Sequence, residues 1–309
     1  METCVVITTY KRAWALPYSI ASLKDQSIPP SKVVFVLKPS GDESEKVIEE
    51  CAEGLNYEIV IQNEGNVAMA VELGIKACKE HDLILFLDDD ALASKNWIEK
   101  YTEFFERNKS AGGASGIVYK AVLEDNKVSL IDEPFYGKEN YTVRSGIHRR
   151  PLPEYKDYCE WLSTSGLIGT KQCNSSFIPS VVLSGVNMAF KTNAVEKCPL
   201  SALYKNSRKC LHYEEMLSYC AKKKGFETYR IVEKGLSPKV YHIANVESLT
   251  RGKGLSHQFW IQYDFSKDYW RLRKLGARVN FLHYLIAMGI IARGNQFIKI
   301  PATLYAIVK

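Results

Sequence analysis

The feature that most constrains the fold of this chain is an uninterrupted apolar run that ends in three acids. Residues 83–87 read Leu-Ile-Leu-Phe-Leu, without the polar alternation of a strand that has one face in water. Such a run predicts a strand buried on both faces, as in the middle of a mainly parallel sheet. Asp88, Asp89 and Asp90 follow at once, and open α/β sheets bind ligands at the carboxyl ends of their strands.

The three adjacent carboxylates predict a cation site. Like charges this close repel one another, and hard divalent ions such as Mg²⁺ or Mn²⁺ prefer carboxylate oxygens and often bridge to substrate phosphates. The alternative is a solvated turn in which an aspartate caps the helix expected to begin near Asn96. A turn does not need three acids behind a fully buried strand, so we favour the cation site.

Strand and helix patterns alternate along the first 90 residues. Strands are expected at 4–9, 33–37, 58–62 and 83–87, separated by helices at 13–25, 42–53 and 68–77. This rhythm indicates βαβ units with right-handed crossovers, and therefore an α/β fold with a mixed, mainly parallel sheet flanked by helices.

The pattern is less regular after residue 95. We expect a helix at 96–108, a strand at 114–123, a strand pair or glycine-broken strand at 181–190, a helix at 214–225 and a strand at 227–232, with Tyr241 and His242 in the following loop. Residues 124–172 show no clear periodicity, and we interpret them as an excursion that shapes a pocket.

The cysteines and the N-terminus bear on the compartment. Eight cysteines are scattered without a C-x-x-C pair, which argues against a zinc ribbon or a redox motif and favours reduced thiols. The chain enters a strand at Thr3 with no basic-then-apolar leader, so a secretory signal is not expected. Both observations favour a cytoplasmic protein.

Basic residues are concentrated in a C-terminal segment, residues 251–309, which contains ten Lys or Arg and two Asp or Glu. Aromatic and basic side chains interleave at 256–276, and two apolar segments follow at 281–292 and 297–308. Neither reaches the roughly 20 residues that a membrane crossing requires. We predict a helical extension that lies on an anionic membrane, peripheral on its cytoplasmic face; the alternative is a helical pair packed on the core, with a solvated basic face.

Five sequence elements occur in the order seen in inverting glycosyltransferases of family 2, which have the Rossmann-like GT-A fold. They are residues 5–12, Asn63-x-Gly65 with Gly74, residues 85–90, Gly185-x-Asn187-Met188-Ala189-Phe190, and Glu214 with Leu217, Tyr219 and Gly225. Each is weak alone, but together they resemble the family across about residues 3–245. The resemblance implies a domain at 1–250, with a nucleotide-sugar-binding half at 1–111 and an acceptor-binding half at 112–250. It implies transfer from a UDP-, GDP- or dTDP-sugar to a hydroxyl of a glycan or lipid-linked acceptor.

The resemblance also implies roles at the cation site. The family's Asp-x-Asp element maps to Asp88 and Asp90, with Asp90 as the direct ligand, Asp88 nearer the ribose and Asp89 as a helper. A further ligand from far down the chain is commonly a histidine, and His242 matches that position, although a lone histidine is more often a surface or core residue. Bound Mn²⁺ or Mg²⁺ would act as a Lewis acid toward the departing diphosphate.

Donor-binding residues are implied in the same way. Thr9 and Arg12 match positions that hold the base and the phosphate, although Arg12 has an alternative reading as a surface charge at a helix start. Relatives usually carry an acid after the second strand; here either Asp42 reaches in or Lys38 or Ser40 contacts the nucleotide, so the base stays open. The implied donor set is Thr9, Tyr10, Arg12, Lys38, Asp42, Asn63, Gly65, Asp88 and Asp89, and the implied substrate-binding set is Gly185, Asn187 and Met188.

Inverting transfer needs a base that takes the proton from the acceptor hydroxyl. The family's base lies in an acidic pair at the start of a helix, which implies Glu214, with Glu215 next to it. Relatives usually have Asp there, so the longer Glu leaves the register open between the two. The alternative is that both acids only stabilise the helix N-terminus through its dipole.

Two other classes compete with a transferase of sugars. A nucleotidyltransferase that makes a nucleotide-sugar would carry a glycine-rich loop after the first strand, and residues 8–12 contain no glycine. A non-catalytic nucleotide-sugar-binding or nucleic-acid-binding protein would leave the acids without a role, although the aromatic tail is able to stack bases. We therefore do not expect nucleic acid as a partner. No G-x-G-x-x-G follows an early strand, which argues against a dehydrogenase.

Overall fold

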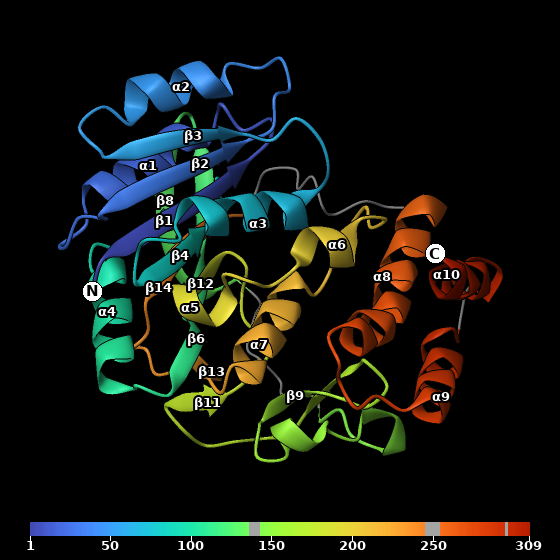
Figure 1. Ribbon diagram of the computed structural model, residues 1–309. Coiled ribbons are helices and arrows are strands. Elements are labelled where there is room, and N and C mark those ends of the chain that lie inside the picture. Colours follow the sequence, from blue (N-terminus) through green and yellow to red (C-terminus); the bar gives the residue numbers. More distant parts are fainter. Residues whose placement is uncertain (136–142, 245–253, 294–295) are drawn as a thin grey trace.

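The computed structural model describes residues 1–135, 143–244, 254–293 and 296–309 (Figure 1). Its main sheet has eight strands in the order β11-β13-β6-β12-β4-β1-β2-β3. The first four strands in the chain are parallel: β1 (Thr3–Thr9), β2 (Lys32–Leu37), β3 (Tyr57–Ile61) and β4 (Leu83–Leu87). The expected mixed, mainly parallel sheet flanked by helices is confirmed.

Helices cover both faces of this sheet, because alternate side chains of its buried strands point to opposite sides. Val5 and Ile7 of β1 pack with α1 (Leu16–Lys24), α2 (Ser44–Cys51) and α4 (Trp97–Arg107). Cys4 and Val6 pack on the other side with α3 (Val67–Ala77) and α7 (Tyr213–Lys223). All five side chains of β4 are buried, as its apolar run predicts.

The other half of the main sheet contains both strand directions. Strand β12 (Asn187–Lys191) runs antiparallel between β4 and β6 (Ala111–Ser115), and β13 (Glu227–Ile231) pairs parallel with β6 and antiparallel with β11 (Phe177–Pro179). The expected strand over 181–190 is therefore only partly present, because residues 181–186 form a loop. Two short helices follow β12, α5 (Thr192–Val195) and α6 (Leu200–Tyr204).

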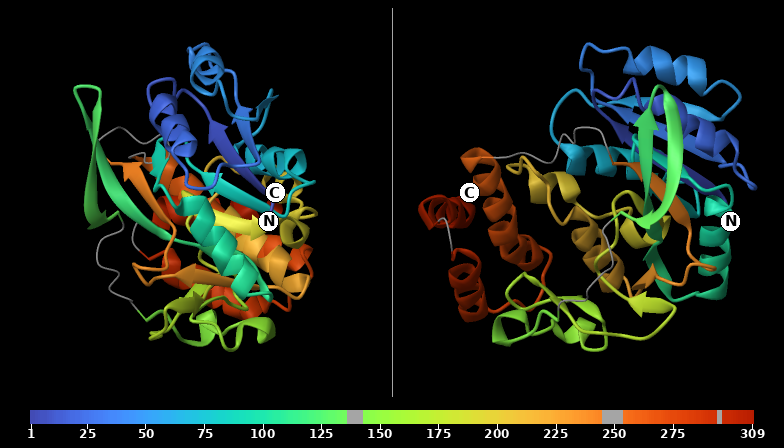
Figure 2. Two further views of the ribbon diagram at one scale, coloured as in Figure 1. Left: turned by 90° about the vertical axis from the view of Figure 1, so that its left-hand side faces the viewer. Right: turned by 180° about the vertical axis from the view of Figure 1, so that it is seen from behind.

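A second, four-stranded sheet stands beside the first (Figure 2). It contains β5 (Ala91–Ala93), β14 (Lys239–Ile243), β7 (Ile117–Glu124) and β8 (Lys127–Pro134). The single strand expected at 114–123 is wrong, since the chain leaves one sheet and enters the other at Gly116, where a Cβ would collide with the Pro238 carbonyl. Tyr241 and His242 lie in β14 and not in a loop, because β5 and β7 pair with this segment.

The expected excursion over 124–172 begins with the β7–β8 hairpin. It continues through two short 3₁₀ turns, Ile147–Arg149 and Pro153–Tyr155, and a small two-stranded sheet of β9 (Glu160–Leu162) and β10 (Ile168–Thr170).

The expectation of reduced thiols is wrong in this structure. Disulfides join Cys4 to Cys78, Cys159 to Cys173 and Cys198 to Cys220, and Cys51 and Cys210 are the only free cysteines, all eight lying in described segments. The partners are 74, 14 and 22 residues apart, so packing of distant elements brings them together. One of the two reasons for a cytoplasmic location is thereby lost.

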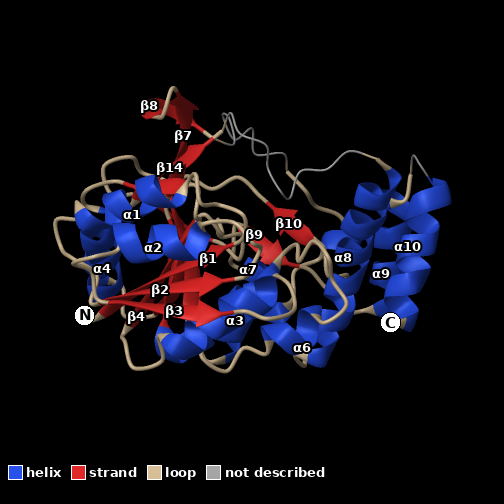
Figure 3. Cartoon of the chain, turned by 90° about the horizontal axis from the view of Figure 1, so that it is seen from above, coloured by secondary structure: helices blue, strands red, loops and turns tan. Residues whose placement is uncertain are grey.

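Three helices end the chain and gather at one end of the molecule (Figure 3). They are α8 (Leu255–Lys274), α9 (Phe281–Ile291) and α10 (Gln296–Val308). Leu272 of α8 and Leu275, which follows the helix, join the hydrophobic core beside α7. The expected boundary between residues 250 and 251 lies outside the described residues. None of the helices in the described segments is long and apolar enough to cross a membrane.

Candidate active site

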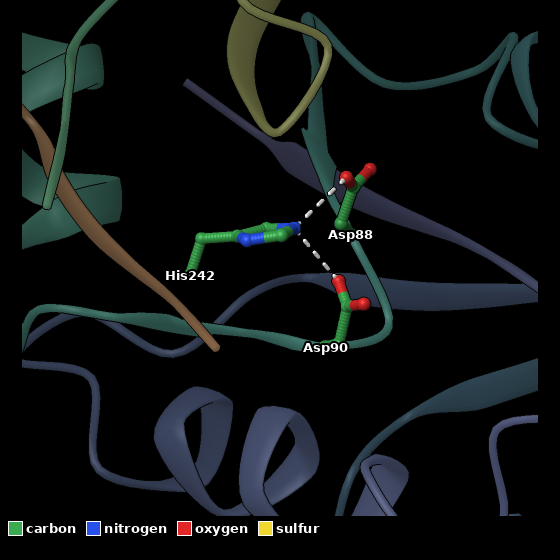
Figure 4. A group of neighbouring side chains, drawn as sticks. All are labelled: Asp88, Asp90 and His242. Atoms are coloured by element: carbon green, nitrogen blue, oxygen red, sulfur yellow. Dashed lines mark ion pairs between the residues drawn. The ribbon is translucent and has the colours of Figure 1, made fainter. Parts of the chain in front are cut away.

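The predicted cation site forms where β4 ends. Asp88 and Asp90 follow β4 directly, and His242 reaches them from β14 because it pairs opposite Ala91 of β5 (Figure 4). His242 Nε2 lies 3.1 Å from Asp90 Oδ1 and 3.9 Å from Asp88 Oδ2. One ligand atom from each residue lies within 4.8 Å of the others. The structure thus brings His242 to the two aspartates proposed as ligands with it, although His242 follows Asp90 by 152 residues in the chain.

The chemistry of this group fits a divalent cation. Two carboxylates and one imidazole are ordinary ligands for Mn²⁺, and the carboxylates alone suit Mg²⁺. Burial and the charge of Asp90 raise the pKa of Asp88 to about 6, which reflects the cost of holding two carboxylates together. A positive ion between them would remove that cost.

Arg12 points into the acid cluster. Its Nε lies 3.4 Å from Asp89 Oδ1 and its Nη2 lies 3.4 Å from Asp90 Oδ2. The side chain is only 10% exposed, so its alternative reading as a surface charge does not hold. Thr9, buried at the end of β1, lies three residues before it. A guanidinium beside the cation site is suited to bind a phosphate.

The other proposed donor residues follow the ends of β1, β2 and β3. Lys38 Nζ donates to the Gly65 carbonyl at 2.6 Å and lies 5.7 Å from the centroid of the exposed Tyr10 ring, which places these three residues together. The Asp42 carboxylate instead accepts hydrogen bonds from the hydroxyls of Ser40 and Ser44, both at 2.7 Å. Asp42 therefore stabilises its own loop, while Asn63 is exposed in the turn before α3.

The acidic pair opens α7, as predicted. Glu214 is half-buried and Glu215 is 4% exposed, with its Oε2 lacking a hydrogen-bond partner among the described residues. Burial and the charge of Glu215 raise the pKa of Glu214 to about 8, and Asp88 adds a smaller effect. Burial likewise raises the pKa of Glu215 to about 7. A carboxylate with a pKa near the working pH is a suitable proton acceptor.

Gly185 lies directly against Glu214. A Cβ at this position would lie 2.5 Å from Glu214 Oε1 and 2.7 Å from the Tyr213 hydroxyl. The loop before β12 therefore needs a glycine to approach the acidic pair this closely. Sequence reasoning missed Tyr213, whose only signal was its position immediately before Glu214; burial and the charges of Glu214 and Asp88 raise its pKa.

Asn187 and Met188 are completely buried and do not face the site. The side-chain oxygen Oδ1 of Asn187 accepts hydrogen bonds from Trp97 Nε1 and the Tyr101 hydroxyl, both at 2.8 Å. Its amide nitrogen donates to the carbonyls of residues 117 and 238 at 3.0 and 2.9 Å. With all these partners inside the protein, the Asn187 side chain has a structural role.

Comparisons with solved structures find the same fold in proteins of low sequence identity. Residues 1–349 of S. aureus TarS in complex with UDP-GlcNAc are 14% identical with a TM-score of 0.51, over 92% of this chain and 69% of that chain. The mannosyltransferase PcManGT from Pyrobaculum calidifontis, in complex with GDP-Man and Mn²⁺, is 14% identical with a TM-score of 0.55, over 99% and 74%. GalNAc-T7 with UDP, GalNAc and Mn²⁺ is 13% identical with a TM-score of 0.55, over 95% and 58%. Against a longer TarS chain, this chain spans 41% of its length.

The family follows from sequence. A search of curated proteins found no match. A family model described as Glycosyl transferase family 2 matches residues 4–161, slightly more than half of the chain. The matched residues include the acids after β4. His242 and α7 lie outside the match. The chain therefore belongs to glycosyltransferase family 2, and it has the GT-A fold of nucleotide-sugar-dependent glycosyltransferases.

Proposed function

We propose that the protein is a metal-dependent inverting glycosyltransferase that moves a sugar from a UDP-, GDP- or dTDP-sugar to a hydroxyl of a glycan or lipid-linked acceptor. One observation carries this proposal: Asp88, Asp90 and His242 meet at the end of β4. Arg12 lies beside these acids, and the charge of Asp88 acts on Glu214. A cation site, a phosphate-binding guanidinium and a proton acceptor thus share one region.

The donor diphosphate is expected to lie between the acids and Arg12. Asp88, Asp90 and His242 would hold Mn²⁺ or Mg²⁺, whose chemistry when bound is that of a Lewis acid for the departing diphosphate. Arg12 adds a fixed positive charge, since contacts with Asp89 and Asp90 orient its guanidinium. Tyr10 and Lys38 lie at the neighbouring strand ends, where the nucleoside is expected.

Glu214 is the proposed base. The acceptor oxygen attacks the anomeric carbon, the bond from that carbon to the diphosphate oxygen breaks, and the hydroxyl proton passes to the Glu214 carboxylate. Attack opposite the leaving group inverts the anomeric configuration. The raised pKa of Glu214 favours this transfer, because a more basic carboxylate holds the proton more tightly.

The solved structures support the donor class and the metal. TarS was solved with UDP-GlcNAc, PcManGT with GDP-Man and Mn²⁺, and GalNAc-T7 with UDP, GalNAc and Mn²⁺. Those ligands belong to those proteins, and they include two different nucleotides. We therefore propose a nucleotide-sugar and Mn²⁺ or Mg²⁺ here, and leave the nucleotide open among the three.

A donor screen tests this function. The protein is incubated with UDP-, GDP- and dTDP-sugars in Mn²⁺, Mg²⁺ or EDTA, and the released nucleotide is identified. Release of nucleoside diphosphate that needs the metal is the expected result. A parallel incubation contains a nucleoside triphosphate and a sugar phosphate. Release of pyrophosphate there would instead identify a nucleotidyltransferase. Binding without any product would indicate a non-catalytic protein.

We further propose that α9 and α10 lie on an anionic membrane surface. Large apolar side chains of these helices face solvent, among them Leu282 (64% exposed), Phe297 (92%), Leu304 (58%) and Val308 (81%). No Asp or Glu occurs after Asp268, whereas seven Lys or Arg do. An apolar surface with basic residues and no acids suits a bilayer interface that carries negative charge. The disulfides do not favour a reducing compartment, so we propose the peripheral location without naming the face of the membrane.

Vesicle sedimentation tests this surface. The double variant Phe297→Ser with Leu304→Ser should lose binding to anionic vesicles while its donor binding stays unchanged. Leu130→Ser is the matched control, because Leu130 is 55% exposed on the distant β8. Equal binding by the wild type and the double variant would contradict the proposal. A concentration-dependent dimer that the double variant abolishes would assign the apolar surface to a second copy of the chain.

A further inference from the structure

The loop that leads into α7 has an unfavourable backbone. Cys210 and His212 both adopt the left-handed conformation, with φ of 53° and 64°, and neither is a glycine. A residue other than glycine keeps this costly backbone conformation only where contacts with the surrounding structure stabilise it. The His212 carbonyl accepts the first hydrogen bond of the helix, from the Met216 N–H at 3.2 Å. His212, two residues before Glu214, is the N-cap residue, and its conformation therefore determines where α7 begins.

Two buried aspartates of α8 hold this loop. Asp264 accepts hydrogen bonds from the Ser207 hydroxyl at 2.7 and 2.8 Å and from the Leu211 N–H at 3.3 Å. Asp268 Oδ2 accepts a hydrogen bond from His212 Nδ1 at 2.5 Å. Asp264 and Asp268 are 0% and 1% exposed, so solvent does not compete for these contacts.

Arg271 links the two aspartates. Its Nη2 lies 2.6 Å from Asp264 Oδ1 and its Nη1 lies 2.8 Å from Asp268 Oδ1. Its guanidinium also lies 3.8 Å from the centroid of the Tyr204 ring. Buried carboxylates need compensating charge, and Arg271, itself 2% exposed, supplies it from three residues after Asp268 and seven after Asp264 on the same helix.

His212 is the group through which this cluster reaches α7. Burial opposes a charged imidazole, but the carboxylates of Asp268 and Glu215 outweigh it and raise the pKa of His212 to about 9. The contact with Asp268 is thus a charge-assisted hydrogen bond, which is stronger than a neutral one. The ring of Phe265 packs edge-on against the imidazole, with centroids 4.8 Å apart.

We infer that Asp268 and His212, supported by Asp264 and Arg271, are positioning residues that fix the start of α7 and with it the carboxylate of Glu214. This inference rests on the proposed role of Glu214 as the base. It gives α8 a function in the reaction, because side chains of a C-terminal helix determine the geometry of the acidic pair. None of the four is required to touch the donor or the acceptor.

Substitution at His212 separates positioning from general stability. His212→Ala removes the contact with Asp268, whereas His212→Asn keeps a side-chain donor and tolerates the left-handed backbone. We expect kcat to fall about 100-fold in the alanine variant, since a misplacement of about 1 Å can have that effect, with donor Kd unchanged. The asparagine variant should recover at least tenfold of that loss. Arg273→Gln, an exposed position on α8, is the control and should retain wild-type kcat.

A second measurement does not depend on activity. Hydrogen exchange at the amides of the first turn of α7 should accelerate in His212→Ala and return toward wild type in His212→Asn. If His212→Ala does not fold, Asp268→Asn replaces it, because this change preserves shape and removes only the charge. Unchanged kcat and exchange in the folded variant would overturn the inference, and so would equal losses in His212→Ala and His212→Asn. A wild type that transfers no sugar would refute the proposed function, while the exchange data would still decide whether His212 fixes α7.

Discussion

The protein has two acidic clusters, and nearby side chains affect the pKa of their carboxylates differently. Near the end of β4, burial and the charge of Asp90 raise the pKa of Asp88 to about 6, whereas for Asp90 the opposing effect of burial is outweighed by a hydrogen bond with His242 and the charge of Arg12, which lower its pKa. At the start of α7, burial and the charge of Glu215 raise the pKa of Glu214 to about 8, and burial with the charges of Asp268 and Glu160 raises that of Glu215 to about 7. The comparison teaches that surrounding charge, and not residue type, suits one carboxylate to ligate a cation and another to accept a proton.

The largest expected effect comes from removing the proposed base. Glu214→Gln should lower kcat by about 1,000-fold, within the range that general-base catalysis contributes, because an amide cannot accept the acceptor's proton. Donor binding, measured by calorimetry, should stay unchanged. Glu49→Gln, at an exposed position on α2, is the control. Full transfer activity in Glu214→Gln would exclude Glu214 as the base.

Removal of a proposed metal ligand should instead weaken donor binding, which removal of the base leaves unchanged. Asp90→Asn should weaken donor binding in Mn²⁺ by about 100-fold. Mutation of a residue that only hydrogen-bonds to a metal ligand can already lower metal affinity by about that factor. Binding in EDTA should be the same for the variant and the wild type. Asp25→Asn, at an exposed helix end, should bind the donor normally. If Asp90→Asn keeps its response to Mn²⁺, the proposed ligand set is wrong.

The pH dependence of kcat/KM should report the acidic pair. Glu214 acts only when ionised, so the rate should rise with pH, with a midpoint near the Glu214 pKa of about 8, and level off at higher pH. Glu215→Gln removes a neighbouring negative charge, which lowers the pKa of Glu214 and moves the rise to lower pH. Rates measured from pH 5.5 to 9.5 in both proteins make this comparison. An identical midpoint would show that Glu215 does not act on the base.

A smaller effect is expected at the loop that packs on Glu214. Gly185→Ala would place a Cβ 2.5 Å from Glu214 Oε1, so the carboxylate must move. We expect kcat to fall about tenfold, less than the 100-fold that a misplacement of about 1 Å can produce. Gly235→Ala is the control, because its Cβ would meet no atom of the described residues within 4 Å. Equal kcat in both variants would mean that the Gly185 contact has no part in placing Glu214.

Local features of the fold were predictable from sequence. The apolar run of β4 is complete within five residues, so its burial and the acids behind it follow from a short stretch of chain. His242 was identified only through the resemblance, and its local structure was predicted wrongly. Strand β14 has few signals of its own, because it forms by pairing with β5 and β7, which lie more than 100 residues earlier.

Features that depend on distant contacts were not predictable. Cys4 and Cys78 meet because β1 packs on α3, and nothing in their spacing indicates this. The motif containing Asn187 suggested a substrate contact, but the buried amide has four partners inside the protein. The contact between His212 and Asp268 joins residues 56 apart, and no sequence pattern marks it.

The side-chain amide of Asn187 has a consequence for the position of His242. It joins α4 to the carbonyls of residue 117, the first residue of β7, and residue 238, which precedes β14. Since β14 carries His242, the location of this imidazole depends on a buried amide that is not itself a proposed ligand. A substitution at Asn187 is therefore expected to disturb cation binding without changing any of the three proposed ligands.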